Sequence, residues 1–184
     1  MATSDTLDRK FSILFDWFDR TEDGWLTHED FEVMAGLFMA IAKPEDHENR
    51  AALREAFGRW WEVLRDAGGT DSEGRVSRQA FIGLMRSHVT DPKTFEHVVL
   101  QIVDALMQAL DTDRNGMLSQ DEYVRMYEAL HIEPATSTPA FHRLDRDGDG
   151  AISHAEFRKA IEEFYLSPDP DAPGNWLLGS PLIT

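Results

Sequence analysis

The sequence contains no cysteine among its 184 residues. A chain without thiols cannot form disulfide bonds, use a thiolate nucleophile, or hold zinc or an iron–sulfur cluster through cysteine. Basic residues are also scarce, with 18 Lys and Arg against 34 Asp and Glu, so the formal net charge is −16. Because this charge repels a phosphate backbone, it argues against a nucleic-acid partner.

Long apolar runs are missing as well. The longest, residues 33–42, is interrupted by Gly36 and is too short to span a bilayer. Residues 1–5 lack the basic and apolar regions of a signal peptide, and residue 2 is Ala2 rather than the glycine needed for myristoylation. We therefore expect a soluble, cytoplasmic protein with no membrane partner. Hydrophobic residues make up 42% of the chain, which is enough for a buried core.

A twelve-residue pattern recurs four times, and we number its copies loops one to four in chain order. The two most complete copies are loop three, DTDRNGMLSQDE at residues 111–122, and loop four, DRDGDGAISHAE at residues 145–156. Loop one, DRTEDGWLTHED at residues 19–30, has threonine at position 3 and aspartate at position 12. Loop two, GTDSEGRVSRQA at residues 69–80, is found by placing Gly74 at position 6. An aromatic residue follows every copy.

Loops three and four match the calcium loop of the EF-hand, D-x-[DN]-x-[DN]-G-x5-E. Oxygens at positions 1, 3 and 5 surround a hard cation, glycine at position 6 permits the sharp turn, and the carbonyl of position 7 adds a ligand. Glutamate at position 12 reaches back with two oxygens to complete the shell. An aliphatic residue at position 8 is expected to form a short strand that pairs each loop with its neighbour.

Part of the pattern has a second explanation. Serine or threonine at position 9 with an acid at position 12 is also a helix capping box, as in Ser153 with Glu156. Capping does not explain the acids at positions 1, 3 and 5. We therefore expect the helix that leaves each complete loop to be capped by residues that also line the ion.

Loops three and four carry complete ligand sets. In loop four the predicted ligands are four carboxylates and one backbone carbonyl, from Asp145, Asp147, Asp149, Glu156 and Ala151. In loop three an amide replaces one carboxylate, and the predicted ligands are Asp111, Asp113, Asn115, Glu122 and the carbonyl of Met117. We expect a tight calcium site in loop four and a competent one in loop three.

Loop one offers a reduced set, namely Asp19, Thr21, Asp23, Asp30 and the carbonyl of Trp25. Because aspartate is one methylene shorter than glutamate, Asp30 is expected to reach the ion with one oxygen. Fewer ligands favour the smaller, six-coordinate Mg²⁺. We predict that loop one binds calcium most weakly of the three, or is shared with Mg²⁺.

Loop two has lost the metal chemistry. Gly69 stands at position 1 and Ala80 at position 12, and Arg75 occupies position 7. We predict that this loop binds no metal but still serves as a partner, because Val76 remains at position 8 and a lone EF-hand leaves its apolar face exposed. Loop one is expected to pair with loop two, and loop three with loop four.

The segments between the loops predict an all-α fold. Apolar residues recur at helical spacing on both sides of the loops, and residues 44–66 are expected to form one extended helix. Asp91 followed by Pro92 is typical of an N-cap and first helical turn, so another helix is predicted to begin there. We expect four EF-hand motifs in two pairs, packed into one compact globule.

Three parts follow from this division. Residues 1–90 form the predicted N-terminal pair, residues 91–166 the C-terminal pair, and residues 167–184 a proline-rich tail. The tail cannot be helical where prolines cluster, and it either is disordered or folds back so that Trp176, Leu177 and Leu178 close the interior.

No catalytic constellation is recognisable, and we expect no enzyme activity. The seven histidines do not form H-E-x-x-H, and G-x-S-x-G and phosphate-binding loops are absent from the sequence. His28 and His154 stand at position 10 of their loops, which points outward in this motif.

The chain resembles the sarcoplasmic calcium-binding proteins and their bacterial relatives of the calerythrin type. The resemblance lies in three metal-competent loops (one, three and four), a second loop without its ligands, and a long spacer after the first EF-hand. The likeness runs from about Leu7 to Gly179. It implies two halves packed face to face and a role as a calcium buffer. The architecture is also similar to luciferin-binding proteins and photoproteins, whose apolar interior holds a small ligand.

The leading hypothesis is therefore a monomeric calcium buffer or transport protein that takes up to three Ca²⁺ ions, with Mg²⁺ competing mainly at loop one. One alternative is a calcium sensor that exposes an apolar groove to a partner protein, although the sequence indicates no particular target. The other is a calcium-regulated carrier of a small apolar molecule.

Overall fold

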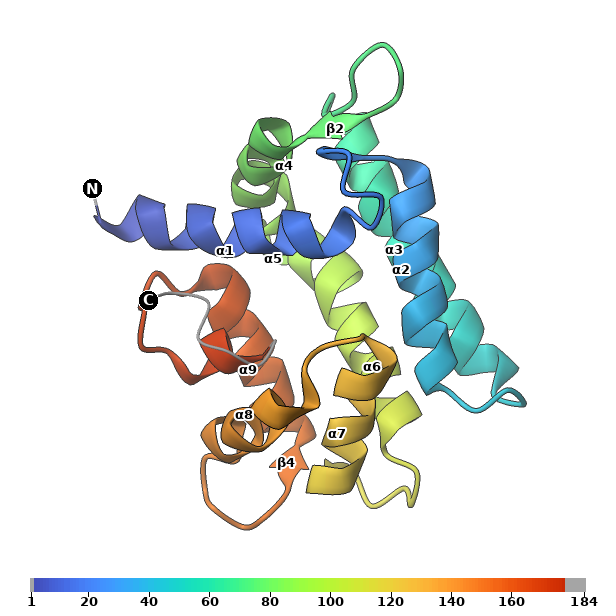
Figure 1. Ribbon diagram of the computed structural model, residues 1–184, viewed down its shortest axis with the longest axis vertical. Helices are drawn as coiled ribbons and strands as arrows, with labels where there is room; N and C mark the ends of the chain where they lie inside the picture. Colours follow the sequence, from blue (N-terminus) through green and yellow to red (C-terminus); the bar gives the residue numbers. More distant parts are fainter. Residues whose placement is uncertain (1, 178–184) are drawn as a thin grey trace.

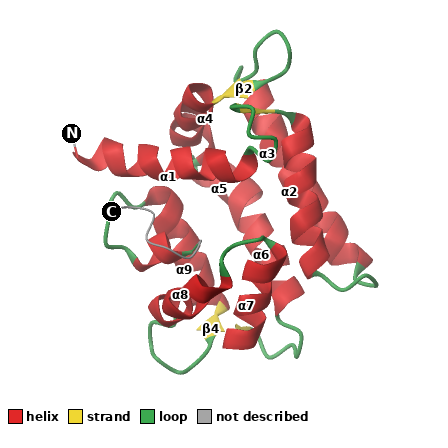
Figure 2. Ribbon diagram, in the orientation of Figure 1, coloured by secondary structure: helices red, strands yellow, loops and turns green. Residues whose placement is uncertain are grey.

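The computed structural model describes residues 2–177, and Figures 1 and 2 show a bundle of helices connected by loops. The longer helices are α1 (Ala2–Phe18), α2 (His28–Ile41), α3 (His47–Asp66), α6 (Gln101–Leu110), α7 (Gln120–Ala129), α8 (Ser137–Leu144) and α9 (His154–Leu166). The shorter ones are α4 (Arg78–Leu84), continued by a π-helical turn η1 (Met85–Val89), and α5 (Pro92–Phe95), continued by a π-helical turn η2 (Glu96–Leu100) into α6. Two 3₁₀ turns, η3 (Pro134–Thr136) and η4 (Pro173–Trp176), complete the helical elements of these residues. None of the described helices is long and apolar enough to cross a membrane.

Helix starts follow from local chemistry. The Asp91 carboxylate accepts hydrogen bonds from the backbone N–H groups of Lys93 and Thr94, at 3.1 and 3.4 Å, and Pro92 occupies the first position of α5. The prediction of a helix beginning at Pro92 is confirmed. Helices α7 and α9 begin with capping boxes, in which Ser119 pairs with Glu122 and Ser153 with Glu156.

Short strands join the loops in the predicted pairs. Strand β1 (Trp25–Leu26) pairs antiparallel with β2 (Val76–Ser77), and β3 (Met117–Leu118) pairs with β4 (Ile152–Ser153). The position-8 residues lie opposite one another and are fully buried: Leu26, Val76, Leu118 and Ile152. The position-8 residue therefore fixes the middle of each loop to the core. In sequence, the ligand positions 1, 3 and 5 precede the strand and position 12 follows it.

The core joins the two halves of the chain. Phe18, at the end of α1, lies 4.9 Å from Phe31 and 5.1 Å from Trp60 between ring centroids. Tyr165 on α9 extends this cluster, with its ring 6.2 Å from Trp60 and 5.6 Å from Phe95. Because one aromatic cluster draws on both EF-hand pairs, the fold is a compact all-α EF-hand globule, as predicted.

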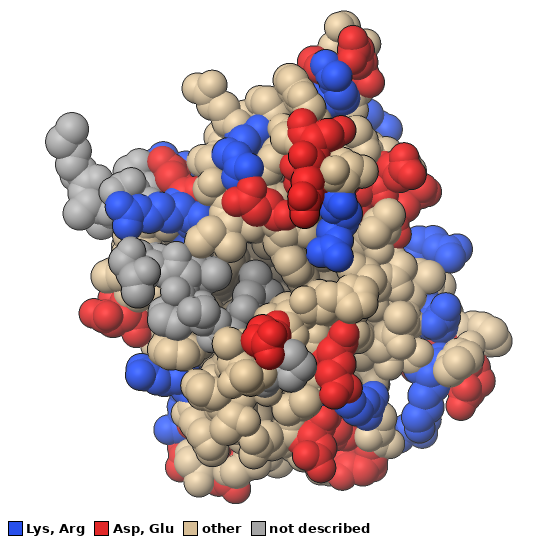
Figure 3. Space-filling view, viewed as in Figure 1, with Lys and Arg blue, Asp and Glu red and all other residues tan. Residues whose placement is uncertain are grey.

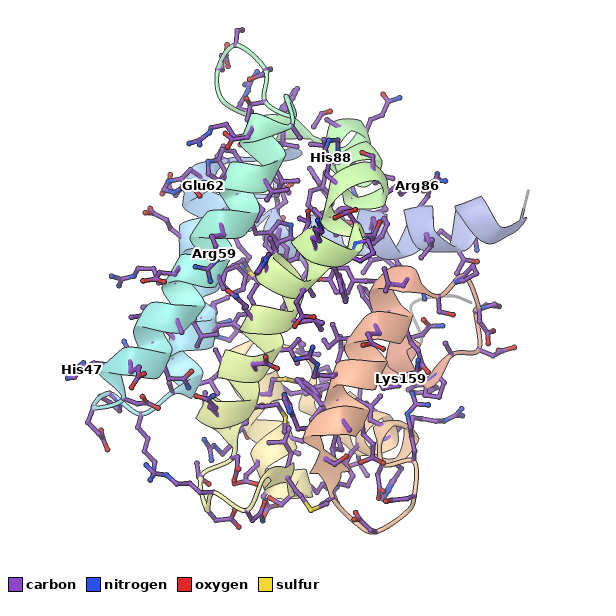
Figure 4. All side chains as sticks on the ribbon, turned by 180° about the vertical axis from the view of Figure 1, so that it is seen from behind. His47, Arg59, Glu62, Arg86, His88 and Lys159 are labelled. Atoms are coloured by element: carbon purple, nitrogen blue, oxygen red, sulfur yellow. The ribbon has the colours of Figure 1, made fainter. Side chains whose placement is uncertain are left out.

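Helices α3 and α6 pack along each other and form a large part of this contact, which Figure 4 shows from behind. Arg59 lies on α3 and donates a hydrogen bond to the side chain of Gln101, the first residue of α6. The predicted long helix over residues 44–66 is present as α3, beginning at His47 after the N-cap Asp46.

Acidic side chains gather near the loops. On the face shown in Figure 3, Asp and Glu lie at the upper and lower ends of the molecule, where Figure 1 places the two loop pairs, and also between them. Part of the negative charge on this face therefore lies around the calcium-loop motifs.

The turn η4 packs against α8 and α9 and lies in front of α9 in Figure 1. The hydroxyl groups of Tyr123 and Tyr127 on α7 donate hydrogen bonds to the carbonyl oxygen of Leu177, at 3.4 and 3.3 Å. Leu177 is buried. The rest of the predicted tail, residues 178–184, lies outside the described residues.

Lys10 on α1 is a buried cation. Its Nζ donates hydrogen bonds to the carbonyl oxygens of Glu163, at 3.1 Å, and Ser167, at 2.8 Å, and so caps the C-terminal end of α9. Burial lowers the pKa of Lys10 from 10.5 to about 8, although Asp169 and Glu163 oppose this shift.

This pKa shift predicts a pH dependence of stability. Between pH 8 and about 9.5 the unfolded chain holds a proton on Lys10 that the native chain has begun to lose, so the free energy of unfolding should rise with pH. We expect a contribution of up to about 1 kcal/mol per pH unit. Denaturant unfolding of the unmodified chain and of Lys10→Met across this range measures it, since other titrating groups cancel in the difference. Equal pH slopes in the two proteins would contradict the prediction.

Candidate metal centres

Three loops share one internal frame, in which the aspartate at position 1 accepts hydrogen bonds from the backbone across the turn. The N–H of the glycine at position 6 donates to this carboxylate at 2.8 to 3.0 Å, in the pairs Gly24 to Asp19, Gly116 to Asp111 and Gly150 to Asp145. These glycines have φ between +81° and +91°, the left-handed region in which a side chain is strained. The frame therefore explains why position 6 is glycine.

Position 5 orders the next part of each loop. Its side-chain oxygen accepts a hydrogen bond from the N–H of position 7 at 2.8 to 2.9 Å, in the pairs Asp23 with Trp25, Asn115 with Met117 and Asp149 with Ala151. The residues predicted to offer carbonyl ligands are thus held by the loop's own side chains.

Carboxylate oxygens converge in loops three and four. Those of Asp111, Asp113 and Glu122 lie within 4.8 Å of one another, and so do those of Asp145, Asp147 and Asp149. The amide of Asn115 donates to Asp113 at 3.0 Å and lies beside the first group. Clustered carboxylate and amide oxygens are the donor set that Ca²⁺ prefers, so both groups fit this ion.

The position-12 glutamate closes loop three. One oxygen of Glu122 accepts hydrogen bonds from the N–H and hydroxyl of Thr112, both at 2.8 Å, and the other from the N–H and hydroxyl of Ser119, at 3.0 and 2.9 Å. Burial opposes ionisation, but these hydrogen bonds outweigh it and lower the pKa of Glu122 to about 2. The carboxylate is therefore charged at neutral pH and bridges the start and end of its loop.

Glu156 closes loop four in the same way. One oxygen accepts from the N–H of Arg146 at 2.8 Å, and the other from the N–H and hydroxyl of Ser153, at 2.9 and 2.8 Å. Burial again opposes ionisation, yet the hydrogen bonds from Ser153, Arg146 and Asp147 leave the pKa of Glu156 below its ordinary value. In loops three and four the position-12 glutamate thus accepts hydrogen bonds from both position 2 and position 9.

Loop one is closed on one side only. Asp30 accepts from the N–H and the hydroxyl of Thr27, both at 2.8 Å, through the same oxygen Oδ2. Among residues 2–177, no hydrogen bond joins Asp30 to Arg20, the position-2 residue of this loop. Asp19, Asp23 and Asp30 also do not form a group of three oxygens as close as those above, within the part of the chain that the structure describes.

In loop two an arginine side chain pairs with the remaining acids. The guanidinium of Arg75 pairs with Asp71 at 3.0 Å and with Glu73 at 2.8 Å, which are the acids remaining at positions 3 and 5. A hydrogen bond from the N–H of Arg75 is the largest cause that lowers the pKa of Asp71. The same guanidinium lies 4.4 Å from the ring centre of Trp25 in loop one. An arginine thus holds the acids of loop two and joins this loop to its partner.

The packing at Gly69 blocks position 1 of loop two. Helix α3 ends at Asp66, and the N–H of Gly69 donates to the carbonyl oxygen of Leu64 at 2.9 Å. A Cβ atom on Gly69 would lie 2.7 Å from that oxygen and 2.2 Å from Cδ1 of Leu84. An aspartate here would therefore require the end of α3 to move.

The clustered acids are all predicted by the loop pattern, but the residues that donate hydrogen bonds to them from position 2 are not. Thr112 and the backbone of Arg146 stand at position 2, which the calcium-loop pattern leaves unspecified. The loop pattern places Arg75 at position 7 but does not predict its pairing with both acids of loop two. His28 and His154 have exposed side chains, and His154 lies 2.8 Å from Asp104 of α6 rather than inside its loop.

Comparison with known proteins agrees with this geometry. Residues 99–130 match the family model of an EF-hand domain pair, and residues 139–166 match that of an EF-hand domain. The fold and the loops at these residues are of the EF-hand class.

Within this class the chain resembles sarcoplasmic calcium-binding protein and calerythrin. It is 28% identical to "Sarcoplasmic calcium-binding protein" of Perinereis vancaurica tetradentata over 131 residues, which cover 71% of this chain and 73% of that protein. It is 26% identical to "Calerythrin" of Saccharopolyspora erythraea, over 77% of this chain and 79% of that protein. The solved structure of a coelenterazine-binding protein from Renilla muelleri has a TM-score of 0.63 at 24% identity, covering 98% of each chain, which shows a shared fold.

The reach of Asp30 gives a prediction for loop one. Asp30→Glu should add the missing closing contact and raise the calcium affinity of this loop about five- to tenfold relative to magnesium, because ligand number sets the preference for the larger ion. Calcium titration at fixed magnesium measures the change. Asp121→Glu, the same chemical change at an exposed non-ligand position of loop three, is the control. Unchanged affinity after Asp30→Glu would contradict the role given to side-chain length.

The packing at Gly69 gives a second prediction. The double variant Gly69→Asp, Ala80→Glu restores the acids of loop two, but it should bind no additional ion and should lose about 1–3 kcal/mol of stability through overpacking. Ion counting and denaturant unfolding provide the two measurements, with Ala80→Glu alone as the control. A further bound ion at undiminished stability would show that the site is restored by its acids alone.

Proposed function

We propose that this protein is a calcium buffer or transport protein that takes up to three ions, in loops one, three and four. Calcium binding itself is the common property of its EF-hand domains and named relatives. The observation that carries the proposal is the pair of convergent carboxylate groups in loops three and four.

In this proposal the ligands are the residues that the sequence pattern specifies. Loop four uses Asp145, Asp147, Asp149, Glu156 and the carbonyl of Ala151. Loop three uses Asp111, Asp113, Asn115, Glu122 and the carbonyl of Met117. Loop one uses Asp19, Thr21, Asp23, Asp30 and the carbonyl of Trp25, and it is the site at which Mg²⁺ competes. The hydrogen-bond frames of these loops support this assignment.

A buffer role is favoured over a sensor role because apolar surface is already buried. Among the described residues, the large apolar side chains that stand out as exposed are Val33 and Leu166, each at 43%, and they are isolated. Leu177 lines the interior together with residues of both EF-hand pairs. A sensor, by contrast, presents an apolar groove when it binds calcium. We propose a monomer in the cytoplasm, built from units 1–90 and 91–166 and the tail 167–184.

The carrier alternative has one observation in its favour. An apolar interior cavity is lined by aromatic and aliphatic side chains, and the buried indole N–H of Trp60, one of its lining residues, has no hydrogen-bond partner within the described part of the chain. The cavity volume is about 60 Å³. Pockets for organic ligands are typically about 300 Å³ or more, so this interior suits a water or a very small molecule rather than a chromophore.

Dye binding separates these roles. We expect the fluorescence of a hydrophobic dye to stay unchanged when calcium is added to the full chain at constant magnesium, because a buffer exposes no new apolar surface. The double variant Glu122→Gln, Glu156→Gln is the control for effects unrelated to the C-terminal sites. A calcium-dependent rise in the unmodified chain alone would favour a sensor, and a chromophore or lipid that copurifies would favour a carrier.

A further inference from the structure

The segment after α9 is connected to loop four through one carboxylate. Oε2 of Glu163 on α9 accepts a hydrogen bond from the guanidinium of Arg146, at 2.7 Å, and another from the backbone N–H of Gly174, at 3.0 Å. Arg146 is position 2 of loop four, and its own N–H donates to Glu156 at 2.8 Å. We refer to this chain of contacts as the Arg146–Glu163 bridge.

The Arg146–Glu163 bridge is partly buried. The side chain of Glu163 is 14% exposed and that of Arg146 is 32% exposed. Removing one partner of a partly buried ion pair leaves the other charge without compensation, which costs more than at a fully exposed pair. Glu163 is therefore a fixed point on α9 that two separate segments share.

The docked segment fits closely against α9. A Cβ atom on Gly174 would lie 2.2 Å from the carbonyl oxygen of Ala160 and 2.8 Å from Cβ of Glu163. Beside it, the ring of Trp176 lies 4.9 Å from the guanidinium of Arg143, in the last turn of α8 just before loop four. Two arginines near the start of loop four are thus connected to the segment 173–177. Arg143 contacts it directly, and Arg146 is connected to it through Glu163.

We propose that docking of residues 173–177 and calcium binding at loop four are energetically coupled, with Glu163 and Arg146 as the positioning residues that join them. The docked segment fixes Glu163, Glu163 fixes the guanidinium of Arg146, and the backbone of Arg146 holds Glu156 at the start of the loop. The proposal rests on the function proposed for loop four. Coupling of two equilibria is reciprocal, so calcium must also strengthen the docking.

Loop two indicates the direction of the effect. There, Arg75 pairs with both remaining acids of its own loop and occupies them in place of an ion. In this proposal a guanidinium of Arg146 released from Glu163 pairs with the carboxylates of loop four and competes with calcium. Undocking therefore weakens calcium binding, and docking strengthens it.

The variant Gly174→Ala tests this coupling without any change of charge, because its added methyl group prevents close docking. Gly58→Ala on α3 is the matched control, since a Cβ there meets nothing within 4 Å. Chelator-buffered calcium titrations of the full chains, followed by the amide signals of Gly150 for loop four and Gly24 for loop one, give the affinities. We expect Gly174→Ala to lower the affinity of loop four at least about fivefold and to leave loop one unchanged.

A second pair of variants covers the case in which Gly174→Ala fails to fold. Glu163→Gln and Glu162→Gln each remove one negative charge from neighbouring positions of α9, but Glu162 contacts Lys159 rather than Arg146. We expect a larger loss of affinity at loop four for Glu163→Gln than for Glu162→Gln. Equal losses would mean that only the local charge matters, and they would overturn the coupling.

Amide hydrogen exchange gives a readout of the segment itself. In the unmodified chain we expect calcium to slow exchange at the amides of residues 174–177, and we expect this protection to be lost in Glu163→Gln. Exchange that is insensitive to calcium, or affinities that match between Gly174→Ala and Gly58→Ala, would overturn the coupling while calcium binding stands. If loop four of the unmodified chain bound no calcium, the proposed function would fail together with the coupling.

Discussion

The distance that the position-12 carboxylate spans is the constraint on which the loops depend. Glu122 and Glu156 bridge both ends of their loops, from the backbone at position 2 to the hydroxyl at position 9. Among residues 2–177, the hydrogen bonds to the Asp30 carboxylate come from position 9 alone. One methylene thus separates a closed loop from a half-closed one, and the pKa values of the two glutamates are lowered by the same hydrogen bonds that fix them.

The buried strands make this closure possible. Leu118 and Ile152 lie opposite each other in the core, so the middle of each loop is anchored there. Carboxylates that are held close together repel one another, and a divalent cation relieves this repulsion. Three calcium ions would reduce the formal net charge from −16 to −10, so part of the excess negative charge is accounted for by the proposed sites.

Local chemistry made much of this predictable. The loop positions, the helix that begins at Pro92 and the helix over residues 44–66 all depend on residues close in sequence, and the pairing of the loops follows from the repeat of the motif. The residues that connect distant segments were not predictable in this way. Lys10 meets the end of α9 across 157 residues, and Arg146 reaches Glu163 only because α9 and the start of loop four pack side by side. Such contacts are set by the packing of the helices, which carries no short sequence pattern.

The number and order of bound ions test this account most directly. Calorimetric titration of the full chain with calcium at constant magnesium, combined with ion counting, distinguishes the loops by affinity. The account predicts two tighter sites that require Glu122 and Glu156, one weaker site that competes with magnesium and requires Asp30, and no site in loop two. Four bound ions, or tightest binding at the site that depends on Asp30, would contradict it.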